Sequence, residues 1–355
     1  MGILSTKLTH VLLQLSILIS ISVCCYAHTD GAYMRNADDG FTNRISWMSE
    51  IHDDVMLSEL ALPGTHDSAT FNNNVLEDIV TTQVLTFDEQ FKYGIRVFDM
   101  RVRHISNAFV LHHGLVYVNL NFDDFLKSVE RFLRNNPSET VLFRLKEEHE
   151  PDNNTRSLGD TLKDYLGKYK HVYLNTKDKN IPLGSARGKF IILSDNKEFH
   201  DFGMDYNSCD IQDDYNLKTN WDLYSKWEKI KSHLEKAING DKNTMYINYL
   251  SGSGGSFPYF VASGHSSRGT SAPRLATGLT TPLFKNSYPD FPRISCLIGI
   301  CTIAFEGTNI LTKDKIIEYN ENEKMFKRTI GVIIADFPGD LLIDTIIQNN
   351  KFLEK

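Results

Sequence analysis

The sequence predicts an α/β fold, a single TIM-type barrel of parallel strands that alternate with helices. Three features carry this prediction: apolar runs without strict alternation, an amphipathic helix between two of them, and charged residues at their ends. Runs of this kind are typical of parallel strands that are buried on both faces. They span residues 60–62, 95–102, 109–112, 140–146, 189–193, 244–250 and 330–336.

The predicted helix follows the run at 109–112 and precedes the run at 140–146. Its apolar stripe at helical spacing consists of Phe122, Phe125, Leu126, Val129, Phe132 and Leu133. Acidic residues occupy its first turn, and Arg131 and Arg134 its last, which complements the helix dipole. Strand, helix and strand in this order predict a right-handed parallel crossover, and repetition of that unit gives the barrel.

Charged residues recur at or just past the ends of the predicted strands. They are His66, Asp99, Arg101, His113, Lys146 and Asp336. Enzymes on a TIM-type barrel work at the carboxyl ends of the strands, so we expect these side chains to converge on one mouth. The plainer alternative is that each is an ordinary polar residue that begins a loop.

The residue types at these positions suit chemistry at phosphorus. Two histidines can serve as an acid/base pair, because an unperturbed imidazole titrates near pH ~6.5. The planar fork of Arg101 fits a phosphate group. Adjacent strand residues point to opposite faces, so only one of His112 and His113 enters a given site.

Residues 1–27 read as a secretory signal peptide. Lys7 is the only Lys or Arg, 11–24 is mostly apolar, and Ala27 ends a small-residue cleavage pattern. The apolar run falls short of the ~20 residues of a membrane span, with a retained anchor as the alternative. Removing 27 of the 355 residues leaves 328, which we expect to form one catalytic barrel over 28–355 in a secreted protein.

Charge and cysteine usage narrow the function classes further. The formal net charge is −7, or −8 without Lys7, and no basic stripe indicates nucleic-acid binding. Membrane contact would therefore need local apolar or basic residues. Three cysteines follow the leader, and Cys296 and Cys301 are either bridged or simply buried. Residues 153–155 form an N-glycosylation sequon that matters only in a eukaryotic source.

Two stretches, 196–222 and 251–294, read as loop-rich. The second begins with the glycine cluster Ser251-Gly252-Ser253-Gly254-Gly255. No Lys-Ser or Lys-Thr pair follows and no helix is predicted after it, so a nucleotide loop is a poor match. We expect a mobile loop at the barrel rim instead.

These motifs together resemble the phosphatidylinositol-specific phospholipase C family, in particular its small secreted bacterial-type (X-domain) members. The resemblance runs from Trp47 to Asp336, and its ordered motifs lie at 63–68, 98–103, 111–114, 136–140, 145–148, 183–189 and 331–336. It implies a distorted, partly open barrel. It also implies cleavage of phosphatidylinositol, or of glycosylated anchors, to diacylglycerol and inositol 1,2-cyclic phosphate, with no metal and no cofactor.

The resemblance assigns catalytic roles at matching positions. His66 would be the general base, His113 the general acid, and Arg101 the phosphate clamp. Of the catalytic carboxylates, Asp336 would hold His66, Asp67 would assist His113, and Asp99 would position Arg101.

It also implies an inositol pocket made by Lys146, Arg187, Asp213 and Tyr215. Asp214 is an alternative to Asp213, and Glu148 is a supporting acid. The implied partner is a phosphatidylinositol-containing membrane surface, touched peripherally and transiently by a monomer.

One departure concerns the rim, where some secreted relatives carry exposed tryptophans. The corresponding stretches here, 76–84 and 255–259, contain none, and Phe257 and Tyr259 are the candidate substitutes. Two other readings stay open: a metal-dependent barrel phosphodiesterase of the glycerophosphodiesterase or sphingomyelinase-D type, and a non-catalytic lipid-binding barrel. The first needs carboxylates around a cation, and Arg101 is unfavourable beside one.

Overall fold

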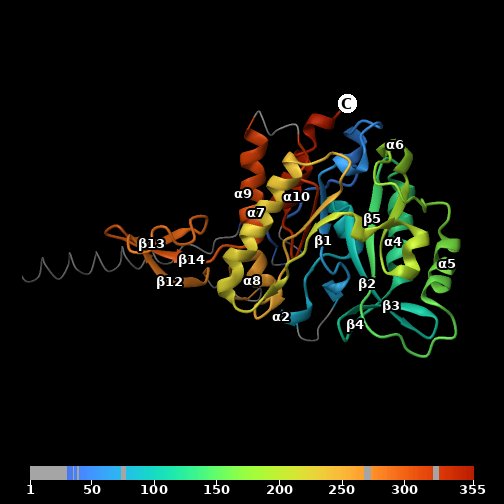
Figure 1. Ribbon diagram of the computed structural model, residues 1–355, viewed down its shortest axis with the longest axis horizontal. Helices are drawn as coiled ribbons and strands as arrows, with labels where there is room; N and C mark the ends of the chain where they lie inside the picture. The colour runs from blue at the N-terminus through green and yellow to red at the C-terminus, as the bar shows by residue number, and fades with distance from the viewer. Residues whose placement is uncertain (1–29, 35, 38–39, 73–76, 268–272, 323–327) are drawn as a thin grey trace, which may run out of the picture.

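The computed structural model describes residues 30–34, 36–37, 40–72, 77–267, 273–322 and 328–355 (Figure 1). The leader predicted at 1–27 lies outside these residues. Within them, no helix has both the length and the apolar character needed to cross a bilayer.

The predicted barrel is confirmed as a curved parallel sheet whose strands are hydrogen-bonded in the order β7-β6-β5-β2-β1-β15-β10-β8. The strands are β1 (Leu62–Thr65), β2 (Val97–Ile105), β5 (Thr140–Glu147), β6 (Lys189–Asp195), β7 (Met204–Asp205), β8 (Asp210–Gln212), β10 (Tyr246–Tyr249) and β15 (Val332–Ala335). Each neighbouring pair along this path is parallel. The end strands β7 and β8 are not hydrogen-bonded to each other in the described chain, so the barrel is open there, as expected.

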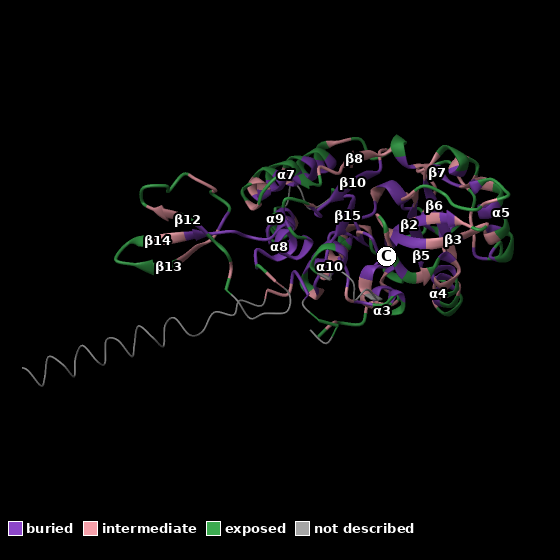
Figure 2. Ribbon diagram, turned by 90° about the horizontal axis from the view of Figure 1, so that it is seen from below, coloured by how far each residue is buried: buried purple, intermediate pink, exposed green. Residues whose placement is uncertain are grey.

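Helices cover the outside of this sheet (Figures 1 and 2). They are α2 (Glu77–Val80), α3 (Phe87–Tyr93), α4 (Phe122–Asn135), α5 (Leu158–Lys168), α6 (Leu183–Ala186), α7 (Leu223–Asn239), α8 (Pro258–Ser263), α9 (Thr308–Glu321) and α10 (Asp340–Gln348). Short 3-10 turns lie at Trp47–Glu50, Leu57–Glu59, Thr70–Asn72, Lys197–Phe202, Tyr206–Ser208, Asn220–Asp222 and Lys351–Leu353.

The helix predicted from its apolar stripe is α4, and all six stripe residues are buried. Phe125 packs edge-on against Phe143 of β5, with ring centroids 5.2 Å apart. Phe132 stacks on Phe91 of α3 at 4.4 Å. This aromatic layer fixes the helix against the strands that carry the predicted site residues, because close-packed cores resist sliding.

A hairpin extends one end of β2 across the carboxyl face of the sheet. It consists of β3 (Ala108–His113) and β4 (Val116–Asn121), which pair antiparallel with β2 and with each other. The strands therefore return the chain toward the mouth, which brings His113 back beside the residues after β1.

The glycine cluster is a paired rim element rather than the mobile loop expected from sequence. Its strand β11 (Ser253–Gly254) pairs with β9 (Asn216–Leu217). A Cβ added to Gly255 would lie 1.8 Å from the carbonyl oxygen of Lys218. The cluster thus contains glycine because another backbone passes too close for a side chain.

The stretch expected to be loop-rich at 251–294 also contains α8 and part of a separate antiparallel sheet. That sheet has the order β12-β14-β13, with β12 (Ala276–Thr281), β13 (Arg293–Leu297) and β14 (Ile300–Ala304). It projects to one side of the barrel in both views (Figures 1 and 2), and residues 276–304 are called the arm below. Cys296 and Cys301 are bridged at the arm's β13–β14 turn.

Residues 31–34, called the N-terminal strap below, run along the loop that follows β15. The Met34 amide donates to the Phe337 carbonyl at 3.0 Å. In return the Gly339 amide donates to the Ala32 carbonyl at 2.9 Å. The strap therefore holds the loop that begins with Asp336.

Candidate active site

The carboxyl ends of β1, β2, β5 and β15 bring the predicted catalytic side chains together. His66 and Asp67 directly follow β1, and Asp336 directly follows β15. The amide of Gln83 donates to the carbonyls of His66 and Ala335, at 2.9 and 3.0 Å, and thereby ties these two strand ends together. The placement predicted from sequence is confirmed for these residues.

His66 lies between an acid and a guanidinium. Its Nδ1 is 2.7 Å from Asp336 Oδ1, and its Nε2 is 2.7 Å from Arg101 Nη2. A guanidinium can only donate, so Nε2 is the acceptor and Nδ1 carries the proton toward Asp336. His66 is therefore held as the tautomer whose Nε2 carries the lone pair, which here accepts the hydrogen bond from Arg101.

The surroundings of His66 also set its affinity for a proton. Burial lowers the pKa of His66 and the Asp336 carboxylate raises it, and the net shift is upward from the usual 6.5. A raised pKa makes the ring a stronger base when it takes up a proton.

Arg101 is the central cation of the site. It donates to Asp99 Oδ2 from Nε at 3.1 Å and from Nη2 at 3.0 Å, and to Glu148 Oε1 from Nη1 at 3.2 Å. Burial lowers the pKa of Arg101, but Asp99, Asp67 and Glu148 outweigh it and raise the pKa well above its ordinary value. The guanidinium is therefore charged and its fork has a fixed direction.

His113 contacts the second carboxylate. Its Nδ1 forms an ion-pair contact with Asp67 Oδ2, and Nη1 of Arg101 lies 3.7 Å from the same oxygen. Burial raises the pKa of Asp67, but Arg101 and His113 outweigh it and the net shift is downward. His112 is 4% exposed and packs beside Tyr117, so the facing of the strand is as expected.

The implied inositol pocket is brought together in part. Lys146 Nζ lies 3.0 Å from Glu148 Oε2, and Glu148 in turn contacts Arg101. Asp213 follows β8 at the carboxyl end, and Tyr215 is 57% exposed at the rim. Asp214 is ion-paired with Lys229 on the outside of the barrel, which argues against it as the ring ligand.

The expectation that Arg187 contacts the substrate is wrong. Arg187 precedes β6, at the amino-terminal end of the barrel and opposite the mouth. It donates to the carbonyls of Met48, Ser138 and Ile51, and to Asp53 Oδ1 at 2.7 Å. Arg187 therefore stabilises the fold, because all three nitrogens of its guanidinium donate hydrogen bonds at the amino-terminal end of the barrel.

Sequence reasoning missed Arg144 on β5, two residues before Lys146. Its Nη1 donates to Asp99 Oδ1 at 3.3 Å and to Tyr249 Oη at 3.2 Å, and its Nη2 to Asp195 Oδ2 at 2.6 Å. Asp99 is thus held between two arginines beneath the mouth. The available signal was a charged residue inside the apolar run 140–146.

Lys226 on α7 was also missed. It is 3% exposed and its Nζ donates to Gln212 Oε1 at 3.2 Å. Burial lowers the pKa of Lys226 to about 8, although Asp213 and Asp336 raise it. It adds a buried cation behind the predicted ring pocket, and its helical position among polar neighbours gave no sequence signal.

The carboxylates of the site are matched by cations rather than grouped around an empty centre. Burial raises the pKa of Asp99, but Arg101 and Arg144 outweigh it, and the pKa lies well below its ordinary value. Among the described residues, no group of three or more His, Cys, Asp or Glu side chains has the arrangement of a metal site. The geometry suits proton transfer beside a fixed positive charge.

This chain is similar to known proteins that are specific for phosphatidylinositol. The family model described as "Phosphatidylinositol-specific phospholipase C, X domain" matches residues 60–196. A 1-phosphatidylinositol phosphodiesterase of Listeria monocytogenes is 27% identical over 323 residues, covering 86% of this chain and 85% of that protein. One from Staphylococcus aureus is 28% identical over 246 residues, covering 59% and 76%.

Solved structures show the same fold. The phosphatidylinositol-specific phospholipase C from Listeria monocytogenes matches with a TM-score of 0.63 at 24% identity, covering 88% of this chain and 100% of that one. The matched X domain contains the residues that form the central contacts of the site, apart from Asp336. Residues 60–196 are therefore similar to the X domain of phosphatidylinositol-specific phospholipase C, and the chain is similar to two 1-phosphatidylinositol phosphodiesterases over much of its length.

Proposed function

We propose that this protein cleaves phosphatidylinositol to diacylglycerol and inositol 1,2-cyclic phosphate by general acid–base catalysis without a metal cofactor. One observation carries the proposal: two histidines, each in contact with a buried carboxylate, flank one guanidinium. These are His66 with Asp336, His113 with Asp67, and Arg101 between them. The names of the two relatives support the same substrate.

The first half of the reaction uses the 2-hydroxyl of inositol as an internal nucleophile. His66 Nε2 takes the hydroxyl proton while the hydroxyl oxygen attacks phosphorus. Arg101, which now donates to that nitrogen, turns its Nη2 toward a phosphoryl oxygen and so frees the lone pair. A tethered nucleophile can be worth an effective molarity of about 10⁵–10⁸ M, so no bound water has to be activated.

The second half expels diacylglycerol. The bond between phosphorus and the glycerol oxygen breaks, and His113 gives its Nε2 proton to that oxygen. Asp67 holds Nδ1 of the same ring and stabilises the charged form from which the proton leaves. The turnover ends with His66 protonated and His113 neutral, and exchange with water restores both.

The ring pocket suits inositol without additional phosphates. Lys146 and Asp213 can each take ring hydroxyls, and Tyr215 can cover a ring face. The carboxylate of Asp213 would repel a phosphate added to the ring. Phosphatidylinositol is therefore the expected substrate in preference to its 4- and 4,5-phosphorylated forms, and a glycosylated anchor would need the mouth to admit its glycan.

The setting follows from the substrate and from the leader. A phosphatidylinositol headgroup lies at a lipid surface, so the enzyme acts there peripherally and transiently. The predicted signal peptide indicates secretion, and all of the proposed machinery comes from a single chain, which is consistent with a monomer.

The test is hydrolysis of phosphatidylinositol micelles in excess chelator, followed by phosphorus NMR. The cyclic phosphate should be the first product to accumulate, and His66→Ala should abolish its appearance. A first signal from phosphatidic acid or from an acyclic inositol phosphate would contradict the internal nucleophile. Loss of activity in chelator with recovery on added calcium would place the protein among the metal-dependent barrel phosphodiesterases.

A further inference from the structure

The free end of the arm carries the two most exposed large apolar residues in the described chain, together with others that are also exposed. Ile298 is 94% exposed, Leu283 80% and Leu297 68%, with Ile300 and Phe284 also exposed. The strand register brings them together: Thr281 pairs with Cys301, and Leu297 with Ile300. Residues 281–284 and 297–300, called the arm tip below, therefore share one end of the sheet.

Apart from Arg293 at the start of β13, the arm tip and its strands contain no charged residue. Residues 276–284 and 294–304 lack Asp, Glu, Lys and Arg altogether, in a chain that is 23% charged. Exposed edge strands are normally protected by charged side chains, and β12 and β13 are both edges of their sheet. A neutral, apolar end of this kind is typical of a surface that is covered when the protein functions.

The turn at the tip keeps an apolar residue where the backbone disfavours it. Ile298 has a φ of +48° and is followed by Gly299 at +79°. Turns with two positive φ values favour Asn-Gly, and a β-branched residue is strained there. Because Ile298 is almost fully exposed, its side chain gains no packing against the rest of the described chain, and a contact outside the molecule would account for an apolar residue at this position.

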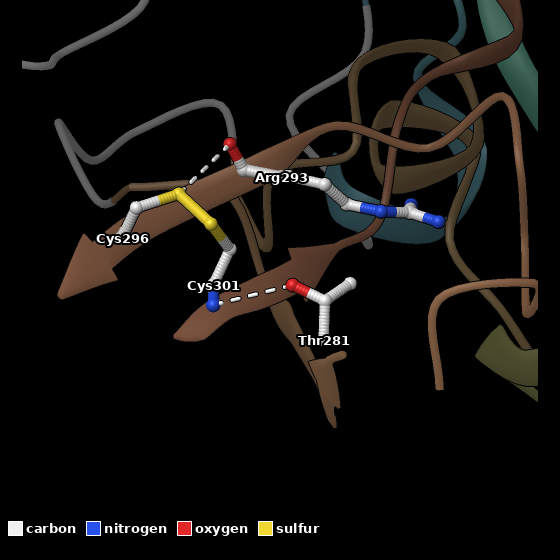
Figure 3. Close-up of a disulfide and its surroundings, with 4 residues drawn as sticks. All are labelled: Thr281, Arg293, Cys296 and Cys301. Carbon is white, nitrogen blue, oxygen red and sulfur yellow. Dashed lines mark hydrogen bonds between the residues drawn. A yellow bond between two sulfur atoms is a disulfide. The ribbon is translucent and has the colours of Figure 1, made fainter. Parts of the chain in front are cut away.

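The arm is held in place by a disulfide and by hydrogen bonds, so its tip can contact another surface as a fixed element. The Cys296–Cys301 bridge closes the turn, and the Cys301 amide donates to Thr281 Oγ1 across the sheet at 3.3 Å (Figure 3). At the base, Arg293 Nη1 donates to the carbonyls of Tyr288 and Phe291, at 2.9 and 2.6 Å. The disulfide and the Cys301–Thr281 hydrogen bond at the tip, and the Arg293 hydrogen bonds at the base, thus stabilise a sheet whose outer end is apolar.

The arm leaves the barrel on the same face as the active site. It is inserted between α8 and α9, in the connection that follows the carboxyl end of β10. Thr308 Oγ1, at the start of α9, donates to the Leu250 carbonyl at 3.0 Å, which fixes this connection at the mouth. Exposed Phe257 and Ile79 lie on mouth-side connections too, whereas Tyr259 is buried and cannot serve as a rim contact.

We propose that the arm tip inserts into the hydrocarbon region of a phospholipid bilayer and holds the mouth against the surface that contains the substrate. This inference rests on the proposed function, because it identifies the surface as the one in which phosphatidylinositol lies. The tip is neutral and the chain carries a formal charge of −7, so binding should not depend on attraction to anionic lipid.

The experiment measures partition onto unilamellar phosphatidylcholine vesicles by co-sedimentation, at low and at high salt. The test variant combines Leu297→Ser with Ile298→Asn, since Asn suits the positive φ of that turn. Vesicle partition should fall by about tenfold or more, because two large side chains no longer enter the lipid. A matched control is Ile317→Gln on α9, an exposed isoleucine away from the arm, which should leave partition unchanged.

Two further readouts separate the possible outcomes. The thermal midpoint of the arm variant should equal or exceed that of the wild type, so a loss of binding cannot come from unfolding. Hydrolysis of a monomeric short-chain phosphatidylinositol should be unaffected by the arm variant. If the wild type does not hydrolyse that monomer, the proposed function is wrong. Vesicle partition would still test, independently, whether the arm tip inserts into the bilayer.

Equal vesicle partition of variant and wild type overturns the inference. So does salt-sensitive partition, which would indicate electrostatic adsorption instead. A dimer in sedimentation velocity that the arm variant abolishes would assign the tip to a second copy of this chain and would likewise overturn it.

Discussion

Asp336→Asn is the sharpest test of the way His66 is held. The carboxylate lies 2.7 Å from Nδ1 and is buried, so it orients the ring and stabilises its charged form. Two unit charges about 4 Å apart interact by about 4 kcal/mol at the effective dielectric of a protein site. Since 1.36 kcal/mol is tenfold, the neutral amide should lower kcat/KM by about 10²–10³-fold.

The pH profile separates this role from a merely structural one. The acidic limb of kcat/KM reports protonation of the base, and Asp336 holds the pKa of His66 above 6.5. Activity should therefore fall as the pH drops through that raised pKa. In Asp336→Asn the limb should move to lower pH, because the cause that raised the pKa is gone.

The assay is hydrolysis of monomeric short-chain phosphatidylinositol from pH 4 to 9, with His66→Ala as the reference for complete loss of the base. Asp336→Asn should retain more activity than His66→Ala, because the imidazole is still present. An acidic limb that stays in place, or a variant as inactive as His66→Ala at every pH, would refute the pairing as the source of basicity.

Further predictions concern the other charged side chains. His113→Ala should reduce turnover by about 10²–10⁴-fold. His112 is buried, so His112→Ala should instead lower the thermal midpoint. A larger loss of turnover in His112→Ala than in His113→Ala would show that His112 is the ring at the mouth. Arg101→Lys should lose about 10²–10³-fold in kcat despite keeping the charge, and added metal should not rescue it, because an ammonium cannot replace the fork that reaches Asp99 and Glu148. Arg187→Met should lower the free energy of unfolding by about 1–3 kcal/mol in urea titrations while leaving KM unchanged; a raised KM would return it to the substrate pocket.

The barrel and the central site could be read from the sequence because both follow from local rules. Buried parallel strands leave apolar runs, and the residues that end those runs must meet at one face. His66, Arg101 and Asp336 obey this rule, since each lies at a strand end or on an inward strand position. Asp99 and Arg101 are two apart on β2, so they share a face, and the structure shows their hydrogen bonds.

The rest depended on contacts that no local pattern carries. Arg187 shares the letters of a family motif, yet it precedes its strand and so lies at the opposite end of the barrel. Arg144 is recognisable only once the barrel has formed, because its partner Asp195 comes from the neighbouring strand β6 and Tyr249 from β10, which is not next to β5 in the sheet. The arm escaped detection because its strands are short and interrupted by turn residues, which read as loop.

The N-terminal strap would link processing of the predicted leader to the chemistry of the site. Met34 and Ala32 are hydrogen-bonded to the segment that immediately follows the acid behind His66. If the leader is cut after Ala27, Gly31 becomes the fourth residue of the secreted chain. A protease that trimmed a handful of further residues would remove the strap and release that acid's loop, so the exact cleavage position would set the specific activity of the secreted enzyme.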